Sequence, residues 1–575
     1  MANRITGYKV LYDLSDVTAV SDASYTVSAQ QSFADIDLID TDISMDKGVT
    51  LEHNFFVLDG TKTFLDDIPD DVPFWSAGLS KADGTFTNNP TITVAFTNNH
   101  SSIGFTLRFV EDYPLEMRIK WYKGADIIDA KVYTINSLEF KAYNSVSDYN
   151  KVVFEFIKAR PNRYVKVEYI RYGIITEFND TNCSDAKIVE QTDIKGNNIP
   201  ISTLSIDLFS ADRDFAINSQ NSLQNYFQKK QPAECYAIVD GVETFLGHFY
   251  FDTLNSKGLY STSLNMNDII GIFEQFTFAG GLYNNYSAST LIRQIMAIIG
   301  ISNYTIDTSL ASATISGCIK PCNCREALKK ILTAIEAIAV TMFTDGIKFI
   351  PKIQPVIKNR ILRENKFSTT ITKNVHVSGV KVKYSNWKKS IEAQNVVDDV
   401  YDAGTYEIEF SNPSDDLSAS GATIIESTLF GCKFTVDADN TQVVISCKEY
   451  TENNLSCQVV NAGDTNVNII EIDAPLANNK QAMNIARNML NWYNRHTLSI
   501  KAKYLTDFIE GLSENIILED AYLEYDGYIG NINQMSINLH GGCIVDADIF
   551  ADYYDNRIGY AYCDSELYAG EEVLL

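Results

Sequence analysis

Three cysteines lie close together in the sequence, at Cys318, Cys322 and Cys324, and cysteine thiolates are common ligands of zinc and iron. A structural zinc site needs four ligands, and its cysteines usually come in pairs separated by two residues. Here the spacing is C-x₃-C-x-C, and no fourth ligand stands nearby. We therefore expect thiols beside the start of a helix, and the sequence predicts no metal site and no cofactor.

The histidines offer no further chemistry, because none has a neighbour at the spacing of a metal ligand or a catalytic partner. They are His53, His100, His248, His376, His496 and His540. The sequence also lacks the G-x-S-x-G, H-E-x-x-H, P-loop and G-x-G-x-x-G motifs. No catalytic residue can be assigned, and we expect a protein that is not an enzyme.

An acidic turn and two tryptophans each allow more than one interpretation. The acidic turn at residues 66–71 could bind calcium through carboxylates, but it lacks EF-hand spacing and is more typical of a solvated loop. Trp75 and Trp121 could contact a glycan or another protein, since tryptophan rings stack on sugars. The alternative for both is a place in the core of a β-sandwich. A glycosidase carboxylate pair is defined by a distance in space, which sequence does not give.

Composition excludes several classes of function. The chain has 575 residues, with 47 basic and 74 acidic side chains and a net charge of −27. Such an acidic chain is unsuited to wrapping nucleic acid or lying on anionic lipid. The N-terminus lacks the apolar run of a secretory signal, so we expect the ten cysteines to be reduced in a protein made in the cytoplasm.

The hydrophobic pattern predicts a mainly β protein with a few amphipathic helices, arranged in separate α+β units. Alternating segments with turn signals fill residues 45–175 and predict a β-sandwich. Helices are expected at 287–300, from Asn323 onward and at about 478–494, with apolar stripes at helical spacing. A hairpin is expected from Val340–Phe343 and Ile347–Ile350, turned at Asp345-Gly346.

The order of these elements resembles the central hub proteins of bacteriophage tail baseplates and tail tips. The segments that carry the resemblance are Gly247-His-Phe-Tyr-Phe-Asp252 with Ser261–Asp268, the helix Arg325-Glu-Ala-Leu-Lys-Lys-Ile-Leu332 with the hairpin Thr344–Pro351, and the helix Ala482–Tyr493 with Gly527–Ile532 and Gly541-Gly542. The match covers about 176–400 and 471–550. It implies β-barrel hub domains.

Residues 45–175 resemble a second family, the galactose-binding-like (discoidin-type) jelly rolls inserted in tail proteins. The segments that carry this likeness are Thr50–Gly60, Phe74-Trp-Ser76, Ser80–Phe86 and Gly104–Phe109. Some members bind glycans and others only contact proteins, so no sugar-binding residue is transferred. The module is expected to fold when it is cut out of the chain.

These patterns give a domain map with five parts. They are an extended hub segment at 1–44, the β-sandwich at 45–175, hub β-barrel and α+β domains at 176–400, a small inserted β domain at 401–470, and the closing helix, strands and tail at 471–575.

The hub resemblance implies a structural virion protein at the tail baseplate or tip. It would form a homotrimer that closes the tail tube and lets the tape-measure protein and DNA pass. The implied partners are a distal tail or tail-tube protein, the tape-measure protein, and tip or receptor-binding proteins. An acidic ring would repel DNA and so let it slide. The alternative is a tail adhesin that binds a cell-surface glycan through the jelly roll, and a less favoured one is a cell-wall hydrolase.

Overall fold

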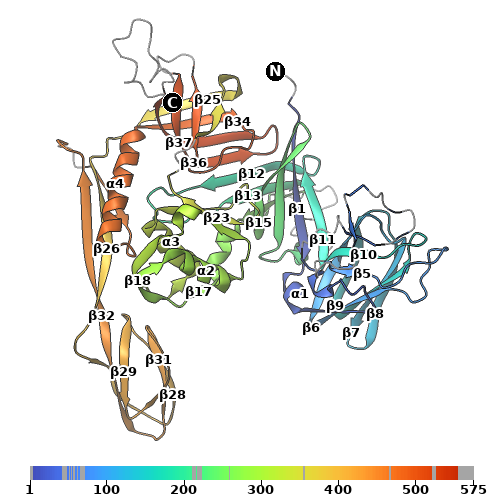
Figure 1. Ribbon diagram of the computed structural model, residues 1–575, viewed down its shortest axis with the longest axis horizontal. Coiled ribbons are helices and arrows are strands. Elements are labelled where there is room, and N and C mark those ends of the chain that lie inside the picture. Colours follow the sequence, from blue (N-terminus) through green and yellow to red (C-terminus); the bar gives the residue numbers. More distant parts are fainter. Residues whose placement is uncertain are drawn as a thin grey trace.

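The computed structural model describes residues 4–41, 48–50, 52, 55, 59–60, 62–64, 72–209, 215, 223–257, 260–353, 357–464, 468–520 and 526–554. A large central sheet carries a helical α+β unit beside it, a β-sandwich at the right and a small β domain at the lower left (Figure 1). The predicted mainly β class with α+β units is confirmed. None of the described helices is long and apolar enough to cross a membrane.

The central sheet has 13 strands and draws on both halves of the chain. Along its main path they are β11 (Gly173–Asn179), β1 (Thr6–Ser15), β14 (Pro232–Val239), β15 (Val242–Ser256), β16 (Ser261–Asn267), β13 (Thr203–Phe209), β12 (Cys183–Gln191), β36 (Gly527–Asn538), β37 (Ile544–Tyr554), β34 (Leu498–Leu505) and β25 (Lys366–Lys373), with β35 (Asn515–Glu519) on β36 and β24 (Ile357–Ile361) on β35.

The halves join where β12 pairs with β36, from Lys187↔Asn538 to Gln191↔Gln534. The main path has two ends, β11 and β25, so the described part of one chain does not close this sheet into a barrel. Alternating residues of its strands fill one continuous core; in β1 these are Tyr8, Val10, Tyr12 and Leu14.

The α+β unit contains the three predicted long helices. They are α2 (Ala288–Ile299), α3 (Cys324–Ala334) and α4 (Asn479–Arg495). The caps explain their bounds: the Ser287 side chain accepts from the Thr290 N–H, and Gly300 ends α2 with a φ of 82°. Asn323 caps α3, and Asn478 forms a full capping box with Gln481 at α4.

Short strands complete this unit. They are β17 (Thr277–Phe278) with β21 (Cys322–Asn323), β18 (Gly281–Ser287) with β20 (Thr314–Ile319), and β19 (Tyr304–Ile306), β23 (Ile347–Pro351) and β22 (Ala337–Val340) in a third sheet, with the 3₁₀ helices η3 (Ile269–Gln275) and η4 (Thr308–Leu310). The predicted hairpin is present as β22 and β23, but its first strand ends at Val340. Phe343 has a φ of 55°, which is incompatible with an extended strand, so residues 341–343 belong to the turn.

The small β domain has its own apolar core, centred on Phe434, Val443 and Ile445. Its strands are β27 (Gln394–Tyr401), β29 (Ser414–Ser420), β28 (Gly404–Glu409), β30 (Thr423–Thr428) and β31 (Gly431–Val436). The 20-residue β32 (Thr441–Val460) leaves this domain and pairs with β26 (Gly379–Lys389), which also pairs with β33 (Ile469–Asp473). The domain therefore begins before the predicted residue 401, because Val397 on β27 belongs to its core.

The β-sandwich at the right of Figure 1 is built on one sheet of seven strands. They are β5 (Phe74–Trp75), β10 (Lys166–Arg171), β6 (Thr91–Phe109), β9 (Glu139–Lys158), β7 (Glu116–Lys123) and β8 (Asp126–Thr134), with β2 (Ala23–Val27) on β6; β3 (Gly48–Val49) and β4 (Thr63–Phe64) form a separate pair. Register shifts between Ala95 and Gly104 divide the pairing of β6 with β9 into two stretches. The expected jelly roll is not confirmed.

Residues assigned from sequence to an N-terminal hub segment also belong to this sandwich. β2 pairs with β6 from Ala23↔Phe96 to Val27↔Ile92, and Ala19 on α1 (Val17–Asp22) lies in the sandwich core. His100 of β6 is buried between two carboxylates, with Nδ1 2.8 Å from Asp16 Oδ2 and Nε2 3.0 Å from Asp22 Oδ2. Among the described residues of the predicted segment, 4–41, only those of β1 join the central sheet.

This arrangement predicts where an excised sandwich must begin. A fragment of residues 16–172 should unfold in one cooperative transition, because it retains β2, α1 and both partners of His100. A fragment that begins at residue 45 should be molten or much less stable, because β6 then loses a neighbouring strand. Circular dichroism and thermal unfolding of the two fragments check this. Equal stability would show that residues 16–44 are dispensable.

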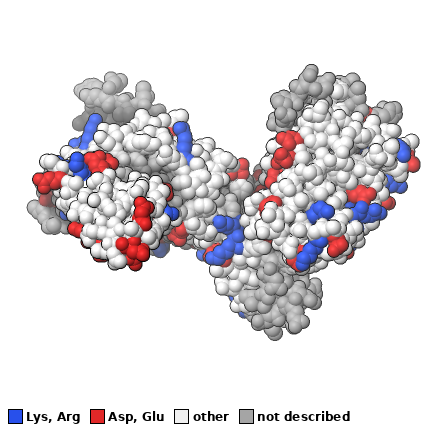
Figure 2. All heavy atoms as spheres, turned by 90° about the horizontal axis from the view of Figure 1, so that it is seen from below, with Lys and Arg blue, Asp and Glu red and all other residues white. Residues whose placement is uncertain are grey.

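The chain carries a net negative charge, but the face seen in Figure 2 has no single dominant acidic patch. There, acidic and basic side chains are both scattered over the two lobes.

Candidate functional site

The two tryptophans singled out from the sequence lie in the core. Trp75 and Trp121 are both 0% exposed. Trp75 packs edge-on against Phe33, and Trp121 stacks on Phe105 with ring centroids 6.0 Å apart. Neither ring reaches the surface, so this structure gives no support to a glycan or protein contact through them.

The three clustered cysteines occupy different elements at one end of the α+β unit. Cys318 is buried on β20, Cys322 is half-buried on β21, and Cys324 is buried at the first position of α3. Burial raises the pKa of each thiol, so they are poor nucleophiles at neutral pH. The described residues contain no group of three or more histidine, cysteine, aspartate or glutamate side chains placed to hold a metal ion. The acidic turn at 66–71 lies outside the described residues.

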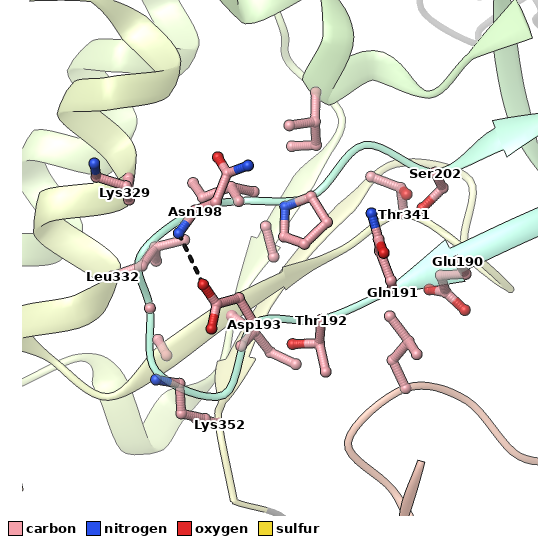
Figure 3. Close-up of a pocket in the computed structure, with 18 of the residues that line it drawn as sticks. Glu190, Gln191, Thr192, Asp193, Asn198, Ser202, Lys329, Leu332, Thr341 and Lys352 are labelled. Atoms are coloured by element: carbon pink, nitrogen blue, oxygen red, sulfur yellow. Dashed lines mark hydrogen bonds between the residues drawn. The ribbon is translucent and has the colours of Figure 1, made fainter. Parts of the chain in front are cut away.

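A cluster of buried and half-buried ionisable side chains that the sequence analysis did not single out lies between the central sheet and the α+β unit (Figure 3). We call it the buried polar junction and define it by the buried Glu190, Asp268 and Lys352, the half-buried Asp193, and the neighbouring half-buried Glu336. The loop from Thr192 to Pro200 leaves β12 and runs along α3.

Asp268 is buried and well hydrogen-bonded. Its carboxylate accepts from the Thr341 hydroxyl at 2.8 Å, the Ser202 N–H at 3.1 Å and the Ile270 N–H at 3.1 Å. Burial raises the pKa of Asp268 to about 6, and the hydrogen bonds from Thr341 and Ser202 act against this rise. Asp268 thereby caps η3 and ties it to the turn after β22.

Glu190 is buried like Asp268 but is poorly hydrogen-bonded. It projects from β12 into the protein with 1% exposure, and its Oε2 has no hydrogen-bond partner among the described residues. Burial, followed by the negative charges of Asp268 and Glu514, raises the pKa of Glu190 to about 8. Glu190 therefore carries a proton at neutral pH.

Lys352 stands at the other end of the junction. Burial lowers its pKa to about 8, while Asp193 and Glu336 oppose the fall. Burial also raises the pKa of Glu336, whose Oε2 accepts from Asn488 of α4 at 2.9 Å. Asp193 accepts the backbone N–H groups of residues 195, 197 and 198 at 2.9 to 3.1 Å, so it folds the loop back onto α3 (Figure 3).

The volume open to water inside the junction is only about 30 Å³, which is room for one or two water molecules. No substrate of ordinary size fits in this volume. The arrangement links the central sheet to the α+β unit through the hydrogen bonds of Asp268, and joins α4 to the residues after α3 through Asn488 and Glu336.

A sequence signal for Glu190 existed. β12 buries Ala186, Ile188 and Glu190 at alternate positions, so the strand period places this carboxyl on the core side. Asp268 stood in a segment that carried the hub resemblance, but its buried partners Thr341 and Ser202 come from distant parts of the sequence, just after β22 and just before β13. Lys352 gave no local signal.

Comparison with known proteins found no matching family model and no matching curated protein. Among solved structures, the chain is similar to a 43 kDa tail protein of prophage MuSo2 from Shewanella oneidensis, with 7% identity, a TM-score of 0.37 and coverage of 65% of this chain and 95% of that one. A tail protein from Neisseria meningitidis gives 10% identity, a TM-score of 0.38 and coverage of 65% and 93%.

An Escherichia coli component of the type VI secretion system, described as structurally similar to T4 bacteriophage tail proteins gp27 and gp5, gives 8% identity, a TM-score of 0.31 and coverage of 66% and 75%. The chain is thus similar to two tail proteins and one secretion-system component. Identities and TM-scores this low assign neither a function nor a residue role.

Proposed function

We propose that the chain is a structural protein of a bacteriophage tail baseplate or tail tip, a hub of three copies that closes the tail tube. The observation that carries the proposal is the central sheet, which ends in two unlike edges. β11 pairs only with β1, and β25 pairs only with β34 among the described strands.

The β25 edge has the character of an unfilled pairing site. Phe367 and Ile371 on this strand are 58% and 43% exposed, and Val375 just beyond it is 79% exposed. Proteins normally protect long apolar edges, because an open strand recruits another chain. The outer backbone groups of β11 are already bonded by the side chains of Thr106 and Asn182. Contact of β25 with a different surface of the next copy would be head-to-tail, and such contacts close into a ring when the rotation allows.

The count of three copies and the remaining partners rest on the sequence resemblance. These partners are a distal tail or tail-tube protein, the tape-measure protein, and tip or receptor-binding proteins. A net charge of −27 favours passage of DNA without adhesion to the wall of the ring. The burial of Trp75 and Trp121 removes the residues offered for a glycan adhesin acting through the sandwich.

Mass measurement in solution and negative-stain imaging together test this proposal. The native chain, alone or mixed with its neighbouring tail proteins, should give a ring of about 193 kDa, three chains of 64.4 kDa each. The double variant Phe367→Lys/Ile371→Lys should be monomeric, because two charges on the edge oppose pairing.

The matched control is Ile127→Lys/Val132→Lys on β8, where the native side chains are 56% and 52% exposed. It should assemble like the native chain. A monomer under both native conditions would contradict the hub. A ring that survives the β25 substitutions would contradict the role of this edge.

A further inference from the structure

An open groove lies beside the α+β unit. It shares no lining residue with the buried polar junction. It runs between β18, the ribbon of β26 and β32, and the start of α4, and its volume is about 700 Å³. These elements flank one another at the left of Figure 1. This volume is in the range of sites that bind small molecules.

The lining of the groove is unusual for this chain. Of its 15 residues, five are asparagine, four are tyrosine or tryptophan, and none is charged, although charged residues make up 21% of the chain. The aromatic residues are Tyr283, Tyr384, Trp387 and Tyr450. The groove therefore combines flat apolar rings with neutral groups that both donate and accept hydrogen bonds.

Several of these groups have unused hydrogen-bonding capacity. The indole N–H of Trp387 and the side-chain amides of Asn284 and Asn386 make no hydrogen bond to any described residue. Trp387 is also the one tryptophan of the four that is not buried. Lys320 lies over its ring, with Nζ 6.0 Å from the ring centroid, and donates to the Ser411 carbonyl oxygen at 3.0 Å.

Other contacts hold the lining in place before any ligand arrives. The Tyr384 hydroxyl donates to Asn479 Oδ1 at 3.0 Å, and the backbone N–H of Asn285 donates to the Ser316 hydroxyl at 2.9 Å. Groups fixed in this way lose little freedom on binding.

We propose that this groove binds a neutral saccharide. The C–H face of a pyranose ring packs on an aromatic ring, and an asparagine amide can donate to one hydroxyl and accept from its neighbour. Nucleic acids and other anionic polymers would need lysine or arginine in the lining, which has neither. An apolar peptide anchor would need an aliphatic pocket, whereas only Leu282, Leu455 and Ala477 are aliphatic here.

The test uses the full-length protein and an array of neutral oligosaccharides of glucose, galactose, mannose, rhamnose and N-acetylhexosamines, beside acidic polysaccharides and a peptide array. A neutral oligosaccharide should bind, change the tryptophan fluorescence and protect it from acrylamide quenching. The signal reports this groove because the other three tryptophans, Trp75, Trp121 and Trp492, are buried. Calorimetry with the best oligosaccharide then gives Kd.

Trp387→Ala should raise Kd by at least about tenfold, and Asn386→Ala by about threefold to tenfold. Trp387→Phe should keep Kd within about threefold of the native value while losing the fluorescence change, because it retains a ring. Tyr143→Ala, which removes a 58% exposed ring of the sandwich, is the matched control and should leave Kd unchanged.

Three outcomes would overturn the proposal. They are no binding of any neutral oligosaccharide at millimolar concentration, stronger binding of an acidic polysaccharide or a peptide, and saccharide binding that Trp387→Ala leaves intact. None depends on whether the chain forms a ring.

Discussion

Replacing Glu190 with glutamine is expected to make the protein more stable at alkaline pH and to leave it nearly unchanged in acid. In the folded chain the pKa of Glu190 is raised to about 8 from its ordinary value of 4.5. Between these two values the folded state holds a proton that the unfolded state releases. Stability from this group is therefore complete below about pH 4.5 and is lost as the pH rises through about 8.

The size of this effect follows from the shift. Each pKa unit corresponds to about 1.4 kcal/mol, so the native chain should lose up to about 5 kcal/mol across this window. Glutamine mimics the protonated carboxyl and has no proton to lose. Urea unfolding midpoints of the native and Glu190→Gln chains at about pH 5 and about pH 9 measure the difference directly.

Two comparisons make the result specific. Glu364→Gln replaces an exposed glutamate and should follow the native pH profile. Asp268, with its pKa raised to about 6 from 3.8, adds a smaller loss between those values. A native chain whose stability is flat from acid to alkaline pH would contradict the buried proton, as would a Glu190→Gln chain equally destabilised at both ends.

Replacing Lys166 with methionine is expected to destabilise the β-sandwich by about 3–5 kcal/mol. Lys166 Nζ lies 2.7 Å from Glu52 Oε2, and the two side chains are 2% and 0% exposed. The same ammonium lies 3.6 Å from Glu111 Oε2 and 4.2 Å from the centroid of the Trp75 ring. Methionine fills most of the volume but leaves the Glu52 carboxylate buried without its cation.

The double variant Glu52→Gln/Lys166→Met should recover much of this loss, because no buried charge then remains unpaired. Lys257→Met is the matched control: its ion pair with Asp207 is also 2.7 Å long, but the lysine side chain is 50% exposed. It should cost no more than about 1 kcal/mol. Thermal unfolding of the full chain checks all three, and equal losses for Lys166→Met and Lys257→Met would refute this account.

The helices and most strands could be predicted because their signals are local. Ser287, Asn323 and Asn478 each cap a helix through a side chain within three residues, and alternating apolar residues mark the strands. The sandwich boundary could not be placed, because β2 joins β6 across more than 60 residues of sequence. The hydrophobic periodicity of the sequence also did not reveal that strands from the N-terminal and C-terminal halves of the chain form one sheet, joined by the pairing of β12 with β36.

The buried polar junction shows the limit of sequence reasoning at a site. Glu190 could have been found from the strand period, since it shares a face with Ile188. That its carboxyl is buried, and lies near Asp268 and Glu514, so that its pKa is raised, depends on segments that meet only in the folded chain. Trp75 and Trp121 show the converse case, because residue type left both a surface contact and a core position open. Alternation on β7 places Trp121 inward, whereas β5 has only two residues, both buried, and so offered no alternation for Trp75.

The long strand β32 has a mechanical consequence for the small β domain. It is one unbroken strand of 20 residues, about 66 Å from end to end. Along its final half it is bonded to β26 by a register of 11 residue pairs, from Lys389↔Tyr450 to Gly379↔Val460. A pull on the far tip draws both strands in the same direction, because β26 enters the small β domain at the end where β32 leaves it. The load therefore passes in shear to the hydrogen bonds between β26 and β33. The ribbon is therefore a stiff tether, and force applied at the tip arrives at α4 and the α+β unit with little lost to stretching.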